Sequence, residues 1–148
     1  FRRDEVPWRW TVDQTALVLT LRSLADADRL PTDVRGLAAV DLDIPLADQM
    51  MRAAGKAGLD QPEAVADFAI DEFDAETLLD RVPRPMSTGE LQLCALLITL
   101  SGPLPGLAVV DPTAGLDLQR RRAVVHLLRD LAEDRPIWVA SDDPLFSD

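Results

Sequence analysis

The sequence contains a single cysteine, Cys94, so no disulfide can form within the chain. We expect this thiol to be a small buried side chain in a reducing compartment. Basic residues are also few, because 15 lysines and arginines stand against 26 acids and the formal net charge is -11. Such a surface repels phosphate backbones and anionic lipid, which argues against nucleic-acid binding. No apolar run approaches the roughly 20 residues that a membrane-spanning helix needs.

The composition that is present indicates a globular protein. The hydrophobic share is 47% and the charged share 28%, as in folded domains and unlike disordered chains. We therefore treat residues 1–148 as one domain, which is long enough to bury a sizeable core. The first residue is Phe1 rather than methionine, which leaves a trimmed piece of a longer protein as one interpretation.

Two turns, joined by an apolar helix and a strand, dominate the second half of the chain. Residues 87–90, Ser-Thr-Gly-Glu, have the pattern of a capping box at a helix start. Residues 91–100 predict an interior helix, because nearly all of them are apolar. Residues 107–110 predict a buried strand that ends at Asp111. The carboxyl ends of strands in an α/β sheet are where such folds bind ligands.

The remaining segments predict a parallel arrangement. We predict strands at 16–21 and 137–140 and helices at 48–57, from Asp60 onwards with Pro62 in the first turn, and at 119–133. The order strand, helix, strand over residues 107–140 favours a parallel sheet.

These motifs resemble those of the ATP-binding-cassette (ABC) transporter ATPases. Residues 87–90 are similar to that family's signature motif, usually Leu-Ser-Gly-Gly-Gln. Residues 111–117, Asp-Pro-Thr-Ala-Gly-Leu-Asp, resemble the end of its Walker B strand and its D-loop, and the intervening spacing matches without a gap. Residues 138–143 stand where the family has an apolar strand that ends in Ser/Thr-His-Asp. We identify the chain as a degenerate or truncated member of this family.

The resemblance implies an α/β fold with a RecA-like parallel sheet of the P-loop NTPase type. It divides the domain into a reduced sub-sheet region (1–41), a helical subdomain insert (42–84) and a region with the signature, Walker B-like, D-loop and switch segments (85–148). In this alignment Asp41 falls where the family has the glutamine of its Q-loop.

Several catalytic parts of the family are missing or replaced. The only lysine, Lys56, does not lie in a Gly-rich phosphate loop, and we interpret it as a surface residue. Aligning the Pro-Thr pairs puts Asp111 at the catalytic glutamate and Val110 at the metal-holding aspartate. Placing Asp111 at the metal position instead would delete the glutamate. Asp142 stands at the switch histidine, and the only histidine, His126, lies within a predicted helix.

The signature motif keeps more of the family's pattern. In the family two cassettes pair head to tail, and each signature contacts ATP that the partner holds. Ser87 could donate to a phosphate and Gly89 allows close approach, whereas Thr88 crowds the site and Glu90 adds a repelling charge. Ser87 and Glu90 could equally serve only as a capping box. Asp117 likewise is either a plain N-cap or a D-loop contact across a dimer.

We therefore predict a degenerate ABC-type nucleotide-binding domain with impaired or absent hydrolysis. It would pair with a competent cassette, with a membrane-embedded transporter subunit, or with both. ATP and Mg²⁺ would be held mainly by the partner, and we assign no metal ligand here. The resemblance implies a cytoplasmic location, peripheral to the inner face of the membrane. Two alternatives stay open: an ATP-hydrolysing subunit with its phosphate loop upstream of residue 1, and a regulatory protein that uses the core without nucleotide.

Overall fold

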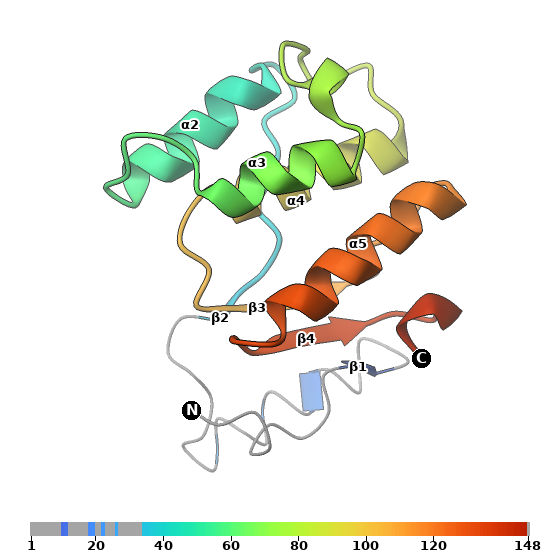
Figure 1. The fold of residues 1–148 in the computed structure, drawn as a ribbon. Coiled ribbons are helices and arrows are strands. Elements are labelled where there is room, and N and C mark those ends of the chain that lie inside the picture. Colours follow the sequence, from blue (N-terminus) through green and yellow to red (C-terminus); the bar gives the residue numbers. More distant parts are fainter. Residues whose placement is uncertain (1–9, 12–17, 20–21, 23–25, 27–33, 148) are drawn as a thin grey trace.

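A four-stranded parallel sheet is the base of the fold (Figure 1). This computed structural model describes residues 10–11, 18–19, 22, 26 and 34–147 of the chain. The strands are β1 (Trp10–Thr11), β2 (Val34–Arg35), β3 (Gly106–Val110) and β4 (Ile137–Ala140). Their order across the sheet is β1-β4-β3-β2, and every pair is parallel. The predicted parallel arrangement is therefore confirmed.

The helices form two groups, and the first packs on the second. The helical block consists of α2 (Leu46–Lys56), α3 (Ala64–Glu72) and the short 3-10 helix η2 (Glu76–Leu78). The later helices are α4 (Thr88–Leu100), α5 (Leu118–Leu131) and the 3-10 helix η3 (Pro144–Phe146). Figure 1 shows α2, α3 and α4 on one side of α5 and the sheet on the other. The helices α2, α3 and η2 all lie within residues 42–84, the segment that the resemblance assigns to a helical subdomain.

Helix α4 lies at the centre of the core, as its apolar sequence predicts. Every residue from Leu93 to Leu100 is buried. Successive side chains of a strand point to opposite faces of the sheet. Leu107 and Val109 of β3, with Ile137 and Val139 opposite them on β4, therefore point to one face and belong to the same core cluster. Helix α5 adds an apolar stripe made of Val124, Leu127, Leu128 and Leu131. This packing holds the carboxyl ends of β3 and β4 in place, and the polar residues that follow these strands lie there.

Two predicted boundaries differ from the structure. Helix α3 begins at Ala64 rather than at Asp60, because Glu63 is extended and its N–H donates to the carbonyl of Ser101 (3.0 Å). That bond holds the residues just before α3 against the end of α4, so they stay outside the helix. The strand predicted at 16–21 lies mostly outside the described residues, and its two described residues, 18 and 19, are helical.

Cys94 is fully buried on α4, and its sulfur lies 3.4 Å from that of Met86. Burial raises the pKa of the Cys94 thiol to about 11. We expect no reaction of the native protein with a disulfide reagent at pH 8, because the thiolate is both rare and inaccessible. Full reaction should follow unfolding in urea. Fast labelling of the native protein, at the rate of a free thiol, would contradict this placement.

Among the described residues, no helix combines the length and apolar character needed to cross a membrane.

Candidate functional site

A cleft of about 530 Å³ opens at the carboxyl ends of β3 and β4. It is lined by three segments: residues 111 and 113–116, Arg121 from the first turns of α5, and residues 141–144 after β4. Ligands of α/β sheets bind at this edge, so the cleft is the candidate site. It brings together Asp111 and Asp142, which the sequence had placed in the same site.

Asp111 turns the chain at the end of β3. Its φ of 48° is left-handed, a conformation that aspartate tolerates better than most residues. Its N–H donates to the carbonyl of Ala140 (2.8 Å), and its own carbonyl accepts from the N–H of Ala114 (3.1 Å) and the amide of Gln92 (3.3 Å). The exposed carboxylate is thus held at the rim of the cleft by the backbone on both sides. Val110, just before it, offers no oxygen ligand.

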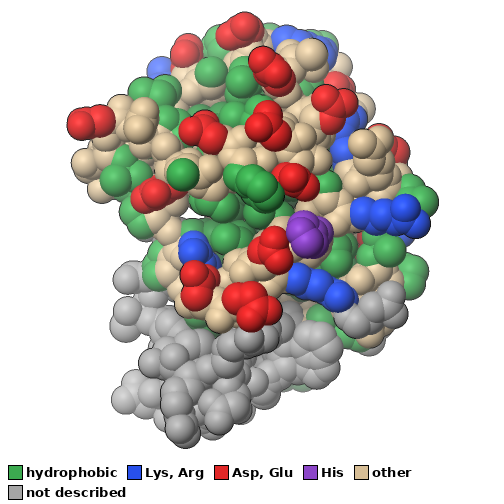
Figure 2. Space-filling view, viewed as in Figure 1, with side chains coloured by type: hydrophobic (Ala, Val, Ile, Leu, Met, Phe, Trp, Pro, Cys, Tyr) green, Lys and Arg blue, Asp and Glu red, His purple; other side chains and the backbone are tan. Residues whose placement is uncertain are grey.

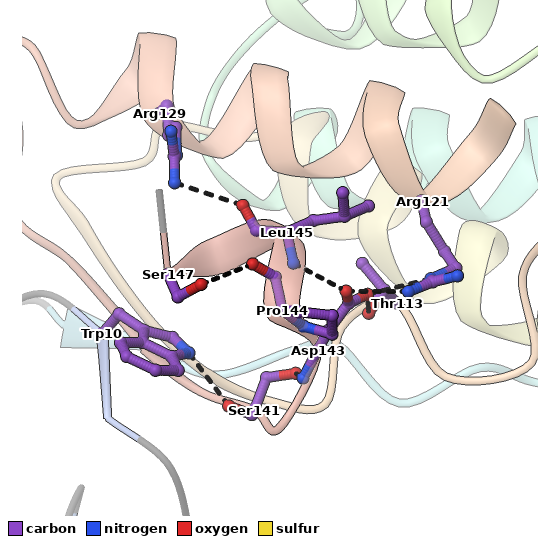
Figure 3. Close-up of polar contacts among 9 residues, drawn as sticks. All are labelled: Trp10, Thr113, Arg121, Arg129, Ser141, Asp143, Pro144, Leu145 and Ser147. Carbon is purple, nitrogen blue, oxygen red and sulfur yellow. Dashed lines mark hydrogen bonds and ion pairs between the residues drawn. The ribbon is translucent and has the colours of Figure 1, made fainter. Parts of the chain in front are cut away.

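A buried carboxylate, Asp143, is among the residues that line the cleft, and Figure 3 shows the polar contacts around it. Arg121 contacts it with two bonds, from Nε to Oδ2 (3.0 Å) and from Nη2 to Oδ1 (2.8 Å). The hydroxyl of Thr113 donates to Oδ2 (2.7 Å), and the N–H of Leu145 donates to Oδ1 (3.0 Å). Donation by Arg121, helped by Leu145 and Thr113, lowers the pKa of Asp143 to about 2 against the opposing effect of burial. The charge of Arg121 is therefore already neutralised within the protein.

Sequence reasoning missed this network. It assigned the switch position to Asp142, which is exposed, and gave no role to Asp143, which is only 7% exposed. The sequence did contain one signal for it. Arg121 lies in the first turn of the predicted helix 119–133, on the side of that helix that faces the carboxyl end of β4. The preceding residue, Ser141, also belongs to this region, because its hydroxyl accepts from the N–H of Asp143 (3.0 Å) and its carbonyl accepts from the indole of Trp10 (2.9 Å).

The signature turn (residues 87–90) starts α4 with the predicted capping box. The N–H of Glu90 donates to the Ser87 hydroxyl (3.1 Å), and the N–H of Ser87 donates to the Glu90 carboxylate (3.1 Å). The backbone bond from Ser87 is the main cause that lowers the pKa of Glu90. Ser87 and Thr88 are exposed, so the turn remains accessible to another molecule. The structure therefore bears out the capping interpretation and leaves a role toward phosphate compatible with it.

The signature turn packs directly against the D-loop turn (residues 114–117). Gly89 is buried, and a Cβ placed on it would overlap the carbonyl oxygen of Gly115 and lie 2.9 Å from its carbonyl carbon. Gly115 itself has a φ of 75°, and a Cβ there would lie 2.9 Å from the nitrogen of Gly89. Only two glycines allow this backbone-to-backbone contact. Gly115 also lines the cleft, so the two motif segments and the cleft form one continuous region.

Asp117 closes the D-loop turn and caps α5. Its carboxylate accepts from the N–H of Arg120 (2.9 Å), as the N-cap interpretation predicts. Its side chain is 61% exposed, so capping does not remove it from reach of a partner.

Asp41, placed at the Q-loop glutamine by alignment, lies away from this cleft. It borders a second cavity of about 730 Å³ between residues 36–41, α2 and the end of α4. Buried Gln49 fixes the segment, since its amide accepts from the N–H of Asp41 (2.8 Å) and donates to the carbonyl of Ile44 (2.7 Å). Arg52 and Lys56 line the same cavity.

Similarity to known proteins is concentrated in part of the chain. Over 81 residues it is 35% identical to an uncharacterized ABC transporter ATP-binding protein of Methanocaldococcus jannaschii, which covers 53% of this chain and 14% of that protein. Over 72 residues it is 39% identical to the biotin transport ATP-binding protein BioM of Rhizobium etli, which covers 48% of this chain and 32% of that protein. The chain thus spans no more than a third of the length of these curated relatives.

Solved structures share the fold. A protein of Pyrococcus furiosus described as an ABC transporter ATP-binding protein matches with a TM-score of 0.69 at 16% identity, over 90% of this chain and 76% of that one. An RNase-L inhibitor matches with a TM-score of 0.65 at 19% identity, over 91% of this chain and 28% of that one. No family model matches the chain. The α/β fold with a RecA-like parallel sheet is therefore confirmed, and the sequence matches, all to ATP-binding proteins of ABC transporters, support the chain as a partial member of the ABC ATPase family.

Proposed function

We propose that this chain is a degenerate ABC-type nucleotide-binding domain that does not hydrolyse ATP in its own cleft. Its accessible signature turn and D-loop turn would instead contact ATP that is bound by a competent partner cassette. The observation that carries this proposal is the contrast between two closely packed motif turns and a cleft whose charges oppose a nucleotide.

The lining of the cleft does not suit a magnesium triphosphate. Arg121 is the only basic residue among the described residues that line it, and Asp143 already neutralises that charge. The two exposed acids, Asp111 and Asp142, would repel phosphate oxygens. A hard cation needs several oxygen ligands, and Val110 occupies the position of the usual aspartate. No group of three or more metal-binding side chains is assembled in the described part of the chain.

The signature turn, by contrast, suits contact with an anion held by another molecule. It lies at the start of α4, where the helix dipole favours an anion, and its Ser87 and Thr88 are exposed. The negative charge of Glu90 weakens this attraction but is partly offset by Arg81, whose guanidinium lies 3.6 Å from the carboxylate. ATP and Mg²⁺ would therefore act in trans, on the partner's side of the interface.

A membrane-embedded transporter subunit is the second partner that we propose. Its contact would be the helical block, beside the 730 Å³ cavity where the exposed Arg52 and Lys56 lie. Elsewhere acids predominate, and Figure 2 shows acidic side chains spread over one face of the molecule with few basic ones between them. The cavity is thus a local exception to the acidic surface, which favours it as the docking side for an acidic segment.

A hydrolysing subunit is the second candidate function. The names of the curated relatives favour it, since each is described as an ATP-binding protein of a transporter. In that case the phosphate loop would lie in residues upstream of residue 1. A regulatory protein that uses the core without nucleotide is the third candidate.

Steady-state ATP hydrolysis tests these candidates. We expect the whole protein, assayed with ATP and Mg²⁺ and with any residues upstream of residue 1 included, to release no phosphate above the buffer rate, because the base, metal and switch positions are altered. A competent cassette assayed in parallel serves as the control for the conditions. Steady turnover by that protein would overturn the proposal in favour of the hydrolysing subunit.

Thermal denaturation separates the remaining candidates. Binding that favours the folded state raises the melting temperature. We expect ATP to raise the melting temperature of this chain only when a competent cassette is present. A shift in neither condition would instead favour the regulatory protein.

A further inference from the structure

We propose that Arg120 is a positioning residue that couples the helical block to the paired signature and D-loop turns. A perturbation of α3 would then change the signature and D-loop turns, which form the surface that we propose for contact with a partner cassette. This inference rests on the proposed function only for the identity of that surface, and its physical content is a connection within the chain.

The guanidinium of Arg120 holds the end of α3. Its Nε donates to the carbonyl of Phe73 (3.0 Å) and its Nη2 donates to the carbonyl of Asp74 (3.0 Å). Phe73 is the C-cap of α3, and Asp74 reverses the chain with a φ of 52°. The end of a helix leaves carbonyls unpaired and carries partial negative charge, which a guanidinium fork satisfies well. No other side-chain hydrogen bonds join residues 63–75 to residues 111–121 in the described structure.

The same residue is also bonded to the D-loop turn. Its backbone N–H makes the N-cap bond to Asp117, and its Nη1 lies 3.8 Å from the second carboxylate oxygen. The D-loop turn in turn contacts Gly89 through Gly115. One side chain therefore connects the end of α3 with the turn that fixes the position of the signature turn.

This connection can be removed without removing the cap. In Arg120→Ala the backbone N–H still donates to Asp117, so α5 keeps its N-cap while the two bonds to α3 are lost. Arg122→Ala is the matched control, because Arg122 is an exposed residue two positions further along the same helix. Both variants lose one positive charge, and only the first loses the connection.

Amide hydrogen exchange after a perturbation of α3 tests the proposal. Asp67 is exposed on α3, and Asp67→Gly should open that helix roughly fivefold more often than Asp67→Ala, because the two differ in helix propensity. In an otherwise native chain, and with Arg122→Ala, we expect the glycine variant to exchange the amides of residues 88–90 and 115–117 at least twofold faster than the alanine variant. With Arg120→Ala we expect that difference to shrink by at least half, although α3 itself still exchanges faster.

The readout separates coupling from stability. Loss of a residue that only stabilises the fold would change the exchange rates at all sites in every background. Loss of a coupling residue would change only the difference between the Asp67→Gly and Asp67→Ala chains at residues 88–90 and 115–117. Equal transmission with and without the Arg120 side chain would overturn the proposal, as would no transmission in the native chain. Arg120→Lys keeps the charge but loses the planar guanidinium fork that binds the two carbonyls, so full transmission through lysine would also count against it.

None of these measurements uses nucleotide or a partner. If the chain hydrolysed ATP, the proposed function would fail while the exchange result stood, so the two failures are distinguishable.

Discussion

Gly89→Ala is expected to destabilise the protein by about 3 kcal/mol. The added methyl would overlap the carbonyl oxygen of Gly115, a backbone atom that cannot rotate away as a side chain can. The two turns would have to separate, which exposes the start of α4 and shifts the D-loop turn. Equilibrium unfolding in urea measures the loss, and hydrogen exchange at residues 115–117 should show where it occurs.

Gly55→Ala is the matched control for this substitution. Gly55 lies within α2, and a Cβ there would have no atom within 4 Å. Alanine should therefore stabilise the protein by about 1 kcal/mol, because it favours the helix without a clash. If Gly89→Ala lowered the free energy of unfolding by no more than Gly55→Ala raises it, the two turns would not pack as closely as described.

Asp143→Ala should have a comparable effect, a loss of about 3 kcal/mol. The substitution leaves Arg121 without its carboxylate and removes the acceptor of the Thr113 hydroxyl and of the Leu145 N–H. An uncompensated charge beside a buried hydroxyl costs more than the ion pair contributes when it is intact. Asp142→Ala is the control, since its exposed neighbour should change stability by about 0.5 kcal/mol or less.

The same carboxylate predicts acid sensitivity. The pKa of Asp143 is lowered from 3.8 to about 2 in the folded protein, so ionised Asp143 favours folding. That contribution, about 2 kcal/mol, is complete above the unfolded pKa of 3.8 and is lost as the pH falls to about 2. Asp143→Asn should therefore differ from the native protein in urea unfolding at pH 5 and approach it at pH 2. A gap that stayed constant over this range would contradict the ionised pair.

Much of the fold could be predicted because its signals are local. The capping pattern of residues 87–90 and the apolar run to Leu100 each determine one element, and both were right. The start of α3 was wrong because a distant partner decides it: the carbonyl of Ser101 binds Glu63 and holds the chain extended. Sequence patterns report local preference and cannot register a bond to a residue that far along the chain.

The site was predicted in its motifs and missed in its contacts. Asp111 and Asp142 line the same cleft, because both follow parallel strands that end at one edge, and their assignment to the catalytic and switch positions stays a prediction. The pairing of Arg121 with Asp143 was not found, because it needs the angle at which α5 crosses the end of β4. The contact of Gly89 with Gly115 was equally hidden, since each glycine alone is only a turn residue.

The position of β1 in the sheet has a consequence for synthesis of the protein. Trp10 and Ser141 are separated by 131 residues, yet the indole of one donates to the carbonyl of the other, and among the described strands β1 has β4 as its neighbour. During translation β1 must therefore wait until β4 has been made before these two strands can pair. A nascent chain that stalls before residue 137 lacks β4, so the strands that β4 joins keep unpaired edges that are open to chaperones or to aggregation.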